Sequence, residues 1–552
     1  MTQTRSETSH DLSHDPFKAS KLFAFPEKPA DFFYLLMRLG LLVCFVASVS
    51  IALLSAFSSR TQWMPFPKHL IRNVSVVSET GTTNISHILF GLAGTVQTWN
   101  KRSRYSEIWW DPNATRGFVW LDKKPTWENS IRPGVSVPYR VSEDWTRFKF
   151  SSSQSAVRIA RIVSESFRLG LPNVRWFVMG DDDTVFFTEN LVSVLASYDH
   201  NEMYYIGGNS ESVEQDVMHA YGMAFGGGGF AISYALAAQL VKLMDGCLDR
   251  YFRFYGSDQR VWACAAEIGV PLTTQRGFHQ FDIRGDPYGI LAAHPLAPLL
   301  SLHHLDYLNP MFPNQTQMES LKFLMQAYRV DPGRILQQSF CYNKRSNWSI
   351  SIAWGYTIQL YTSLLTATEL ALPLLTFKTW RSWSNGPFTF NTRPVSGDPC
   401  AQPVTYFLEK VEEVGKSGSL TTYKRVAAKE GKSCGTPEYA RAMGVERIVV
   451  SSMKMDPENW KKKVEEVGKS GSLTTYKRVA AKEGKSCGTP EYARAMGVER
   501  IVVSSMKMDP ENWKKAPRRQ CCEILDNGTK YKKSSIMVIR IRKCRPRETI
   551  TI

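Results

Sequence analysis

The chain has 552 residues, of which 43% are hydrophobic, so it is too long for one ordinary domain and its composition excludes global disorder. Its formal net charge of +17 would suit a nucleic-acid-binding protein, but most of the positive excess lies beyond residue 409. The rest of the chain is nearly neutral, so we expect no nucleic-acid partner.

The first predicted element is a membrane span near the N-terminus. Residues 39–57 are uncharged and mostly apolar, residues 32–37 extend them, and about 20 such residues cross a bilayer as a helix. A cleaved signal peptide is the alternative, although its apolar stretch would be shorter and closer to the terminus. We therefore expect a cytosolic tail over residues 1–31, an uncleaved signal anchor over residues 32–57 and a stem over residues 58–83.

Glycosylation sequons and cysteines indicate that the part after this span is lumenal. All six Asn-X-Ser/Thr sequons follow the span. Of the ten cysteines, Cys44 lies in the span; setting aside Cys487, which repeats Cys434, leaves an even number suited to disulfides in an oxidising lumen. The candidate glycosylation sites are Asn73, Asn84, Asn113, Asn314, Asn347 and Asn527.

Alternating strands and helices come next and predict an α/β sheet of Rossmann type, which binds ligands at the carboxyl ends of its strands. Apolar residues recur at helical spacing from Ala156 through Ile159 and Val163 to Phe167, which predicts an amphipathic helix. The other expected elements are strands over residues 88–92, 117–121, 174–179 and 204–206, and helices over residues 97–110 and around 191–196.

Three adjacent carboxylates, Asp181, Asp182 and Asp183, follow the predicted strand Arg-Trp-Phe-Val-Met-Gly. Such carboxylates repel one another, so a fold that places them at a strand end usually has a cation to receive them. Oxygen ligands suit Mn²⁺ or Mg²⁺, which could bridge the phosphates of a nucleotide-sugar and stabilise the departing diphosphate. The alternative is an acidic loop that caps the helix beginning near Thr188.

A glycine-rich segment, Ala-Phe-Gly-Gly-Gly-Gly-Phe-Ala-Ile-Ser, spans residues 224–233. Glycines allow the backbone to approach a ligand closely and to adopt positive φ, so we expect Gly227, Gly228 and Gly229 to contact substrate. A flexible turn without a ligand is the alternative reading of this segment.

Asp258, in Tyr-Gly-Ser-Asp-Gln, opens a predicted helix that runs toward Glu267. The helix dipole favours an ionised carboxylate in the first turn, and an inverting transferase needs such a base to take the proton of the acceptor hydroxyl. Simple helix capping is the alternative. Farther along, His303 and His304 supply adjacent imidazoles that could complete a Mn²⁺ site, although such a pair is more often structural.

The C-terminal part is expected to contain strands and one conspicuous repeat. Residues 349–361 alternate apolar and polar side chains as a strand does, and Glu369 and Pro373 argue against a second membrane span nearby. Residues 410–462 recur unchanged as residues 463–515. Repeats that build a solenoid diverge, so this identity indicates a recent duplication or a gene-model error rather than a doubled binding module. Each copy is expected to hold a strand, residues 446–451 in the first, preceded by loop.

The order of motifs resembles the Fringe-related β-1,3-glycosyltransferases, and most closely their plant branch, long described as a domain of unknown function. The motifs are Trp-Phe-Val-Met-Gly-Asp-Asp-Asp-Thr, Phe-Gly-Gly-Gly-Gly-Phe-Ala-Ile-Ser, Gly-Ser-Asp-Gln and His-His-Leu-Asp. The likeness spans residues 88–305, and for the plant branch it runs on through Trp354-Gly355-Tyr356 and residues 518–522. It implies a GT-A type, Rossmann-like nucleotide-sugar-binding domain over residues 84–310, with a β-containing extension over residues 311–409.

The resemblance also implies roles for the motif residues. The triplet would hold Mn²⁺, or Mg²⁺, with Asp181 and Asp183 as ligands and Asp182 as a contact to the nucleotide-sugar. Asp258 would be the base, and the C-terminal metal ligand would be His304, with His303 the second choice. Together these roles describe an inverting enzyme that moves a sugar from a UDP-sugar to a glycan or glycoprotein acceptor. With the anchor and the sequons that follow it, we expect a single-pass type II protein of the Golgi membrane whose catalytic part is lumenal.

Two features depart from the family pattern. The usual paired acids are Ser257-Asp258 here, and the exact duplication separates the catalytic part from the basic, cysteine-containing tail over residues 516–552. Two other function classes therefore stay open: a catalytically silent lumenal glycan-binding or chaperone-like protein of the same fold, and a protein that binds acidic polymers through its tail. The retained carboxylates and histidines favour the enzyme.

Overall fold

The structure is a computed structural model, and the part of the chain it describes begins, apart from Leu42, at Thr82. The expected anchor and stem and the sequons at Asn73 and Asn527 lie outside the described residues, and among these residues no helix has both the length and the apolar character needed to cross a membrane. The described residues are 42, 82–126, 131, 134–149, 154–414, 418–426, 434–453, 500–505, 520–525 and 536–542.

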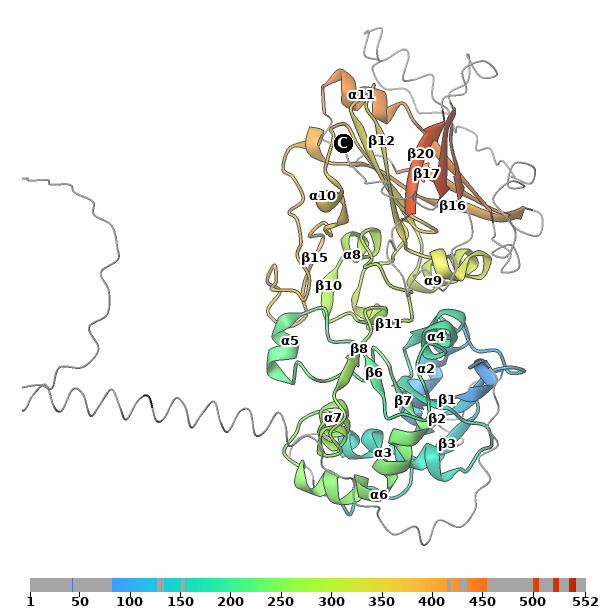
Figure 1. The fold of residues 1–552 in the computed structure, drawn as a ribbon, viewed down its shortest axis with the longest axis vertical. Coiled ribbons are helices and arrows are strands. Elements are labelled where there is room, and N and C mark those ends of the chain that lie inside the picture. The colour runs from blue at the N-terminus through green and yellow to red at the C-terminus, as the bar shows by residue number, and fades with distance from the viewer. Residues whose placement is uncertain are drawn as a thin grey trace, which may run out of the picture. The chain divides into compact units, whose positions relative to one another are not determined.

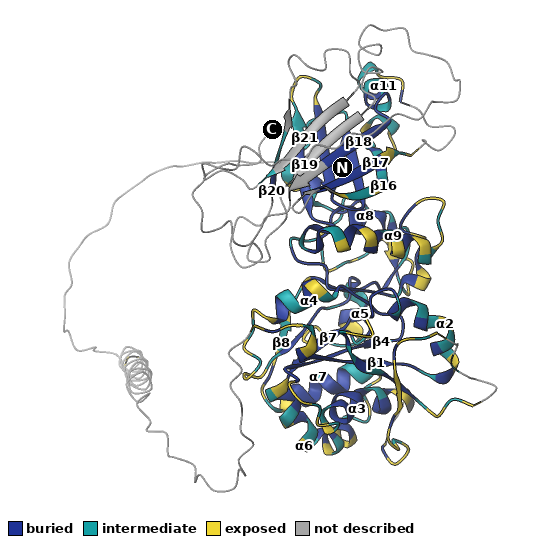
Figure 2. Ribbon diagram, turned by 90° about the vertical axis from the view of Figure 1, so that its right-hand side faces the viewer, coloured by how far each residue is buried: buried dark blue, intermediate teal, exposed yellow. Residues whose placement is uncertain are grey.

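A seven-stranded mixed sheet organises the first half of the described chain, in the order β3-β2-β1-β4-β7-β6-β8 (Figure 1). The strands from β3 to β4 are parallel, and β7 runs antiparallel to both of its neighbours. Figure 2 shows that the central strands β1, β4 and β7 are buried. The strands are β1 Ile88–Ala93, β2 Arg116–Leu121, β3 Tyr139–Val141, β4 Trp176–Asp181, β6 Tyr205–Gly207, β7 Phe230–Ser233 and β8 Leu272–Thr274.

Helices cover both faces of this sheet because successive strand residues point to opposite sides. Leu89 and Phe177 lie in the core shared with α3, α6 and α7, whereas Phe90 and Val178 lie in the core shared with α2 and α4. The expected α/β architecture is therefore confirmed, including each predicted strand and helix between residues 88 and 206. The helices are α2 Val96–Ser106, α3 Gln154–Arg168, α4 Thr188–Leu195, α5 Val213–Met218, α6 Tyr234–Arg250 and α7 Ser257–Glu267.

A small sheet beside the carboxyl end of β4 brings distant segments together. It has the order β5-β11-β9, with β5 at Val185–Phe186, β11 at Ser301–His303 and β9 at Phe278–Gln280. Ser301 pairs with Phe186 on one side and with Phe278 on the other. Because β5 follows directly after Thr184, the residue that succeeds the acidic triplet, this pairing brings His303 of β11 to the triplet.

The C-terminal half contains a closed barrel of the strands β12-β13-β14-β16-β17-β18-β19-β21-β20. Between the two sheets and the barrel, β10 (Ile283–Gly285) pairs with β15 (Phe377–Thr379). The barrel strands are β12 Gln338–Asn343, β13 Trp348–Ala353, β14 Thr357–Tyr361, β16 Val404–Val414, β17 Gly418–Arg425, β18 Arg447–Met453, β19 Arg500–Ser505, β20 Gln520–Leu525 and β21 Ile536–Arg542. The remaining helices are α8 Tyr288–Ala292, α9 Gln317–Val330, α10 Ala367–Ala371 and α11 Pro437–Met443, and the 3₁₀ turns are η1 Ile85–His87, η2 Leu305–Tyr307, η3 Pro332–Arg334 and η4 Pro399–Ala401.

Two expectations for the barrel segment were wrong. Residues 349–361 form a hairpin of β13 and β14 rather than one strand, since Gly355 with φ of 77° turns the chain between them. The segment before β18 was expected to be loop but contains β17 and α11. Its Gly, Lys and Ser content disfavours regular structure locally, but pairing with β16 and β18 and burial of Tyr423 outweigh that preference.

The duplicated segment supplies the same strand twice. Val449 of β18 and Val502 of β19 occupy equivalent positions in the two copies, and both lie opposite Val538 of β21 in parallel pairing. The two copies also pair with each other at Ile448 and Ile501. A barrel without β19 could therefore close through the β18–β21 pairing that already exists.

We expect deletion of residues 463–515 to leave folding and activity intact or improved. The reason is that β18 keeps its register with β21 and the deletion removes the additional cysteine, Cys487. The measurements are the yield of detergent-purified protein and the thermal unfolding midpoint, each compared between the deletion variant and the full chain. Deleting residues 410–462 instead would give the same polypeptide, so a single variant makes the test. A lower yield or a lower unfolding midpoint than that of the full chain would show that two copies are structurally required.

The expected disulfides and exposed sequons are present where the structure describes them. Cys247–Cys264 joins α6 to α7, Cys341–Cys522 joins β12 to β20, and Cys400–Cys434 closes the third described bond. The described sequon asparagines are all exposed: Asn84, Asn113, Asn314 and Asn347.

Candidate active site

The acidic triplet lies where the central strand β4 ends. Residues Trp176–Gly180 are buried, and Asp181 is the last residue of the strand, so the chain emerges at the carboxyl edge of the sheet. Thr184 fixes the turn: its hydroxyl oxygen accepts a hydrogen bond from the Asp181 N–H (2.8 Å), and its hydroxyl donates to the Gly227 carbonyl (2.7 Å). The glycine-rich segment is thereby tied to the triplet.

Asp181, Asp183 and His303 form a cluster that could hold a metal ion. One oxygen or nitrogen from each lies within 4.8 Å of the others. The His303 Nε2 is 3.2 Å from Asp183 Oδ1 and 3.6 Å from Asp181 Oδ2. Asp183 Oδ2 is buried and makes no hydrogen bond among the described residues, although Arg102 lies 3.3 Å away. Two carboxylates and an imidazole are a donor set that suits Mn²⁺.

The electrostatics of the triplet differ from one carboxylate to the next. Desolvation and the neighbouring Asp183 and Asp182 raise the pKa of Asp181 to about 7. Burial also opposes ionisation of Asp183, but His303 and Arg102 outweigh it and hold the pKa of Asp183 well below its usual range. The cluster therefore carries repelling acid groups that a bound cation would relieve.

Asp182 points away from this cluster. Its carboxylate accepts hydrogen bonds from the Thr98 hydroxyl and from Arg102 Nη1 (3.1 Å), both on α2. Its backbone N–H donates to the Ala93 carbonyl of β1 (3.0 Å). Asp182 thus helps to fix α2 and Arg102 beside the triplet, and its expected contact to the nucleotide-sugar stays a prediction.

The structure brings His303, rather than His304, to the triplet. His304 has left-handed backbone (φ of 65°), and its Nδ1 lies 2.9 Å from Asp282 Oδ1. Its ring stacks on Trp380 with centroids 4.6 Å apart. The order of preference implied by the family resemblance is therefore reversed here, because β11 ends at His303 and the chain turns directly after it.

The glycine-rich segment packs against the candidate site instead of opening onto it. A Cβ on Gly227 would lie 1.9 Å from His303 Cε1, so only glycine leaves room for the imidazole. Gly228 donates its N–H to Gln280 Oε1 (2.7 Å), and Gly229 has φ of 88°. These three glycines are buried, whereas the half-buried Gly226 lines the adjoining pocket.

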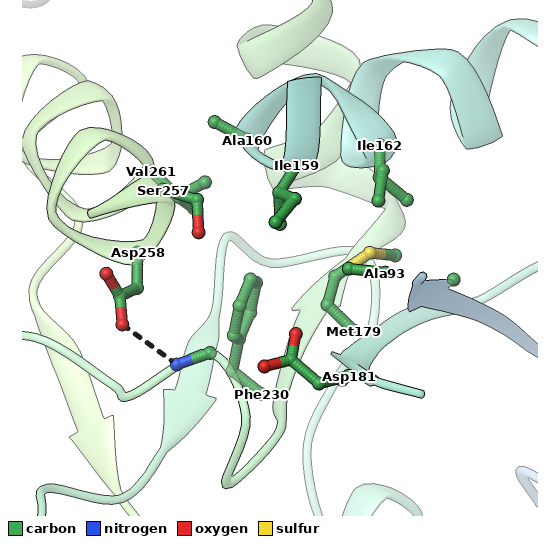
Figure 3. A pocket seen from close by; sticks show the side chains of 13 residues that line it. Ala93, Ile159, Ala160, Ile162, Met179, Asp181, Phe230, Ser257, Asp258 and Val261 are labelled. Atoms are coloured by element: carbon green, nitrogen blue, oxygen red, sulfur yellow. Dashed lines mark hydrogen bonds between the residues drawn. The ribbon is translucent and has the colours of Figure 1, made fainter. Parts of the chain in front are cut away.

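Asp258 and Asp181 line one small pocket of about 20 Å³ (Figure 3). Asp258 lies in the first turn of α7; its Oδ2 accepts the Gly226 N–H (3.1 Å) and its Oδ1 accepts the Gln259 N–H (3.0 Å). Desolvation raises the pKa of Asp258 despite these bonds. A capping contact is therefore present, as the alternative proposed, and Asp258 also shares its pocket with Asp181 of the candidate metal cluster.

Sequence reasoning missed Arg102, Gln280 and Asp282. Gln280 contacts both the Gly228 N–H and His303 Nδ1 (3.0 Å), and Asp282 holds His304. No spacing or motif marks these residues, since each acts on a partner far away in sequence. The only available signal was that two polar residues, Gln280 and Asp282, flank Phe281.

Substitution of the two histidines should separate their roles. His303→Asn is expected to weaken Mn²⁺ binding by about 10–100-fold or more, because mutating even the residues that only hydrogen-bond to a metal ligand typically costs that much. His304→Asn should keep Mn²⁺ binding within a few fold, since asparagine tolerates the left-handed backbone of this position. Calorimetric titration of Mn²⁺ into each purified variant is the measurement. Equal losses in both variants would contradict the assignment of His303.

Two family models match overlapping parts of the chain. Residues 140–281, which contain the triplet and Asp258, match the family described as Fringe-like, and the chain is a glycosyltransferase of this Fringe-related kind. Residues 215–468 and 462–522 match the family described as "Protein of unknown function, DUF604", and together these matches cover more than half of the chain. The chain therefore belongs to the DUF604 family. No curated protein matches it at a significant level.

Several solved structures of glycosyltransferases show distant likeness. The galactosyltransferase LgtC in complex with donor and acceptor sugar analogs is 12% identical, with 42% of this chain and 95% of that chain covered and a TM-score of 0.29. Mannosyltransferase PcManGT from Pyrobaculum calidifontis, in complex with GDP-Man and Mn²⁺, is 11% identical, with 35% and 55% covered and a TM-score of 0.23. Because these TM-scores are low, the fold is assigned from the strand order of the chain itself.

Proposed function

We propose that this glycosyltransferase is metal-dependent and inverting, and that it moves a sugar from a UDP-sugar to a hydroxyl of a glycan or glycoconjugate. The observation that carries the proposal is the position of Asp258 and Asp181 around one pocket, with Asp183 and His303 beside them. The mixed sheet with an acidic triplet at the end of β4 supports a GT-A type assignment. The β-1,3 linkage is proposed from the family resemblance alone.

The residues divide into a group that would hold the cation and a group that acts on the acceptor. Asp181, Asp183 and His303 would hold Mn²⁺ or Mg²⁺, which when bound supplies Lewis acidity toward a departing diphosphate. Arg102, on α2, forms ion pairs with Asp182 and Asp183 and so offsets part of their negative charge. Asp258 accepts the proton of the attacking hydroxyl, and its raised pKa makes it a stronger base than an exposed aspartate.

The direct test uses the purified full-length chain in detergent with a panel of UDP-sugars, an acceptor mixture and Mn²⁺, and measures UDP release. Release with one or two donors, abolished by a chelator and restored by Mn²⁺, is the expected result. Stable binding of UDP and Mn²⁺ without release on any donor and acceptor would instead favour the catalytically silent glycan-binding alternative.

We further propose a type II orientation in the Golgi membrane with the described body in the lumen. The exposed sequon asparagines and the three disulfides support this orientation. Glycosidase treatment of the expressed protein should increase its gel mobility. An unchanged mobility, together with cleavage of the body by protease added on the cytosolic side, would contradict the orientation.

A further inference from the structure

An aromatic surface lies directly beside the candidate active site. It is formed by Tyr307, Trp380 and Trp383 around Arg284 and is called the aromatic platform below. Trp380 stacks on His304, and Tyr307 packs edge-on against Trp380 with centroids 4.4 Å apart. Since His304 and His303 have ring centroids 3.9 Å apart, one imidazole separates the platform from the candidate metal cluster.

The platform is exposed although its rings are large. Trp383 is 55% exposed and Tyr307 is 42% exposed. Trp383 also has left-handed backbone, with φ of 53°, which is strained for a bulky side chain. Folding gains little from an exposed ring held in a strained conformation, and such strain is concentrated at functional sites.

The structure holds the platform in place before any ligand arrives. The Arg284 guanidinium carbon lies 4.7 Å from the Trp380 ring centre and 4.9 Å from that of Trp383, and Arg284 Nε donates to the Trp380 carbonyl (2.9 Å). The loop that carries Trp383 is closed by hydrogen bonds of Thr379 to Ser384, with N–H donating to the Ser384 carbonyl at 3.0 Å. Little side-chain freedom is therefore lost when a ligand binds.

A second set of exposed apolar residues continues from the platform to Asp258. Met218 and Tyr221, at and after the end of α5, are 52% and 57% exposed, and Tyr255, three residues before Asp258, is 58% exposed. The start of α5 is bonded to the segment that follows the platform's loop, since the Val213 N–H donates to the Pro387 carbonyl (3.1 Å). Exposed rings therefore flank the candidate site on both its His304 side and its Asp258 side.

We propose that the aromatic platform is the subsite for a pyranose unit of the acceptor glycan, an inference that rests on the proposed function. The C–H groups of a sugar ring are weakly positive and fit the negative face of an aromatic ring, while hydroxyls can accept from Arg284. Among the described residues no carboxylate pairs with Arg284, so its outer N–H groups can serve a ligand. An acceptor stacked here is separated from the candidate metal cluster by the His304 ring alone.

All four platform residues lie beyond residue 281, where the Fringe-like match ends, and within the DUF604 match. The proposed subsite therefore belongs to the part of the chain that the DUF604 model describes.

The test compares Trp383→Gly with Trp383→Tyr in the full-length chain. Glycine removes the ring and suits φ of 53°, so the variant is expected to fold at least as well; tyrosine restores a stacking face. Tyr139→Ala, which removes an exposed ring on β3, is the matched control. The readouts are binding to an array of immobilised neutral, N-acetylated and uronate-bearing oligosaccharides, KM for acceptor, and calorimetry with UDP and Mn²⁺.

Trp383→Gly is expected to lower array binding and to raise the acceptor KM by at least about tenfold, with rescue by Trp383→Tyr. UDP and Mn²⁺ binding should be unchanged in all variants. If the chain shows no turnover but loses array binding in Trp383→Gly, the platform stands and the transferase proposal fails. Active Trp383→Gly with unchanged KM and array binding, or a wild-type chain that binds no oligosaccharide and shows a KM insensitive to Trp383, overturns the platform.

Discussion

Asp258→Asn is expected to lower turnover by about 10²–10⁴-fold, the usual loss when a general base is removed. The amide is nearly isosteric with the carboxylate and its oxygen can still accept the Gly226 N–H, so the variant loses only the Gln259 N–H bond to the other oxygen and α7 should keep its place. It cannot accept the proton of the acceptor hydroxyl. Mn²⁺ and UDP binding should stay largely in place because Asp258 is outside the cluster of Asp181, Asp183 and His303.

Asp183→Asn is the matched comparison and should fail differently. Asp183 lies 3.2 Å from His303 Nε2, and its pKa is held low by His303 and Arg102 against the cost of burial, so it is ionised at neutral pH. Removing this charge should weaken Mn²⁺ and UDP binding together. Calorimetric titration beside a turnover assay distinguishes the two variants. A normal rate in Asp258→Asn would leave only the capping role for that residue, and unchanged Mn²⁺ dependence in Asp183→Asn would remove the metal assignment.

Gly227→Ala is expected to have the second large effect, although it adds only a methyl group. That methyl would lie 1.9 Å from His303 Cε1, and the backbone of β11 that carries His303 is fixed by pairing on both sides. The imidazole must therefore move away from Asp183. We expect a loss of Mn²⁺ affinity of about 10–100-fold, as for other changes that misplace a metal ligand.

The control is Gly397→Ala, where an added Cβ meets no atom within 4 Å. It should leave Mn²⁺ affinity and the thermal unfolding midpoint unchanged. Overpacking at Gly227 can also cost about 1–3 kcal/mol of stability, so the unfolding midpoint is measured in both variants. A folded Gly227→Ala protein with normal Mn²⁺ affinity would show that His303 can shift without leaving the cluster, or that it is not a ligand.

Because of the exact duplication, the barrel contains two interchangeable partners for β21. Both copies present the same strand to β21 in the same register, so one copy can replace the other without altering the pairing. The family match is likewise divided into two overlapping segments, residues 215–468 and 462–522, near the boundary where the first copy ends and the second begins at residue 463.

Local sequence determined the helices and strands of the α/β half and the positions of the candidate carboxylates on them. The period of apolar residues located α3, and the run before Asp181 located β4, because helices and strands bury side chains at different spacings. The carboxylates at the end of β4 and Asp258 at the start of α7 followed from those boundaries.

Only the tertiary structure decided which groups meet. His303 reaches Asp183 across 120 positions of sequence because β11 pairs with β5, and nothing local distinguishes it from His304. Arg102 joins the triplet from α2 in the same way. In the barrel, pairing and burial around Tyr423 overrode the loop preference of residues 418–425. Contacts of this kind depend on strand pairing between distant segments, whose energy does not appear in any local pattern of side chains.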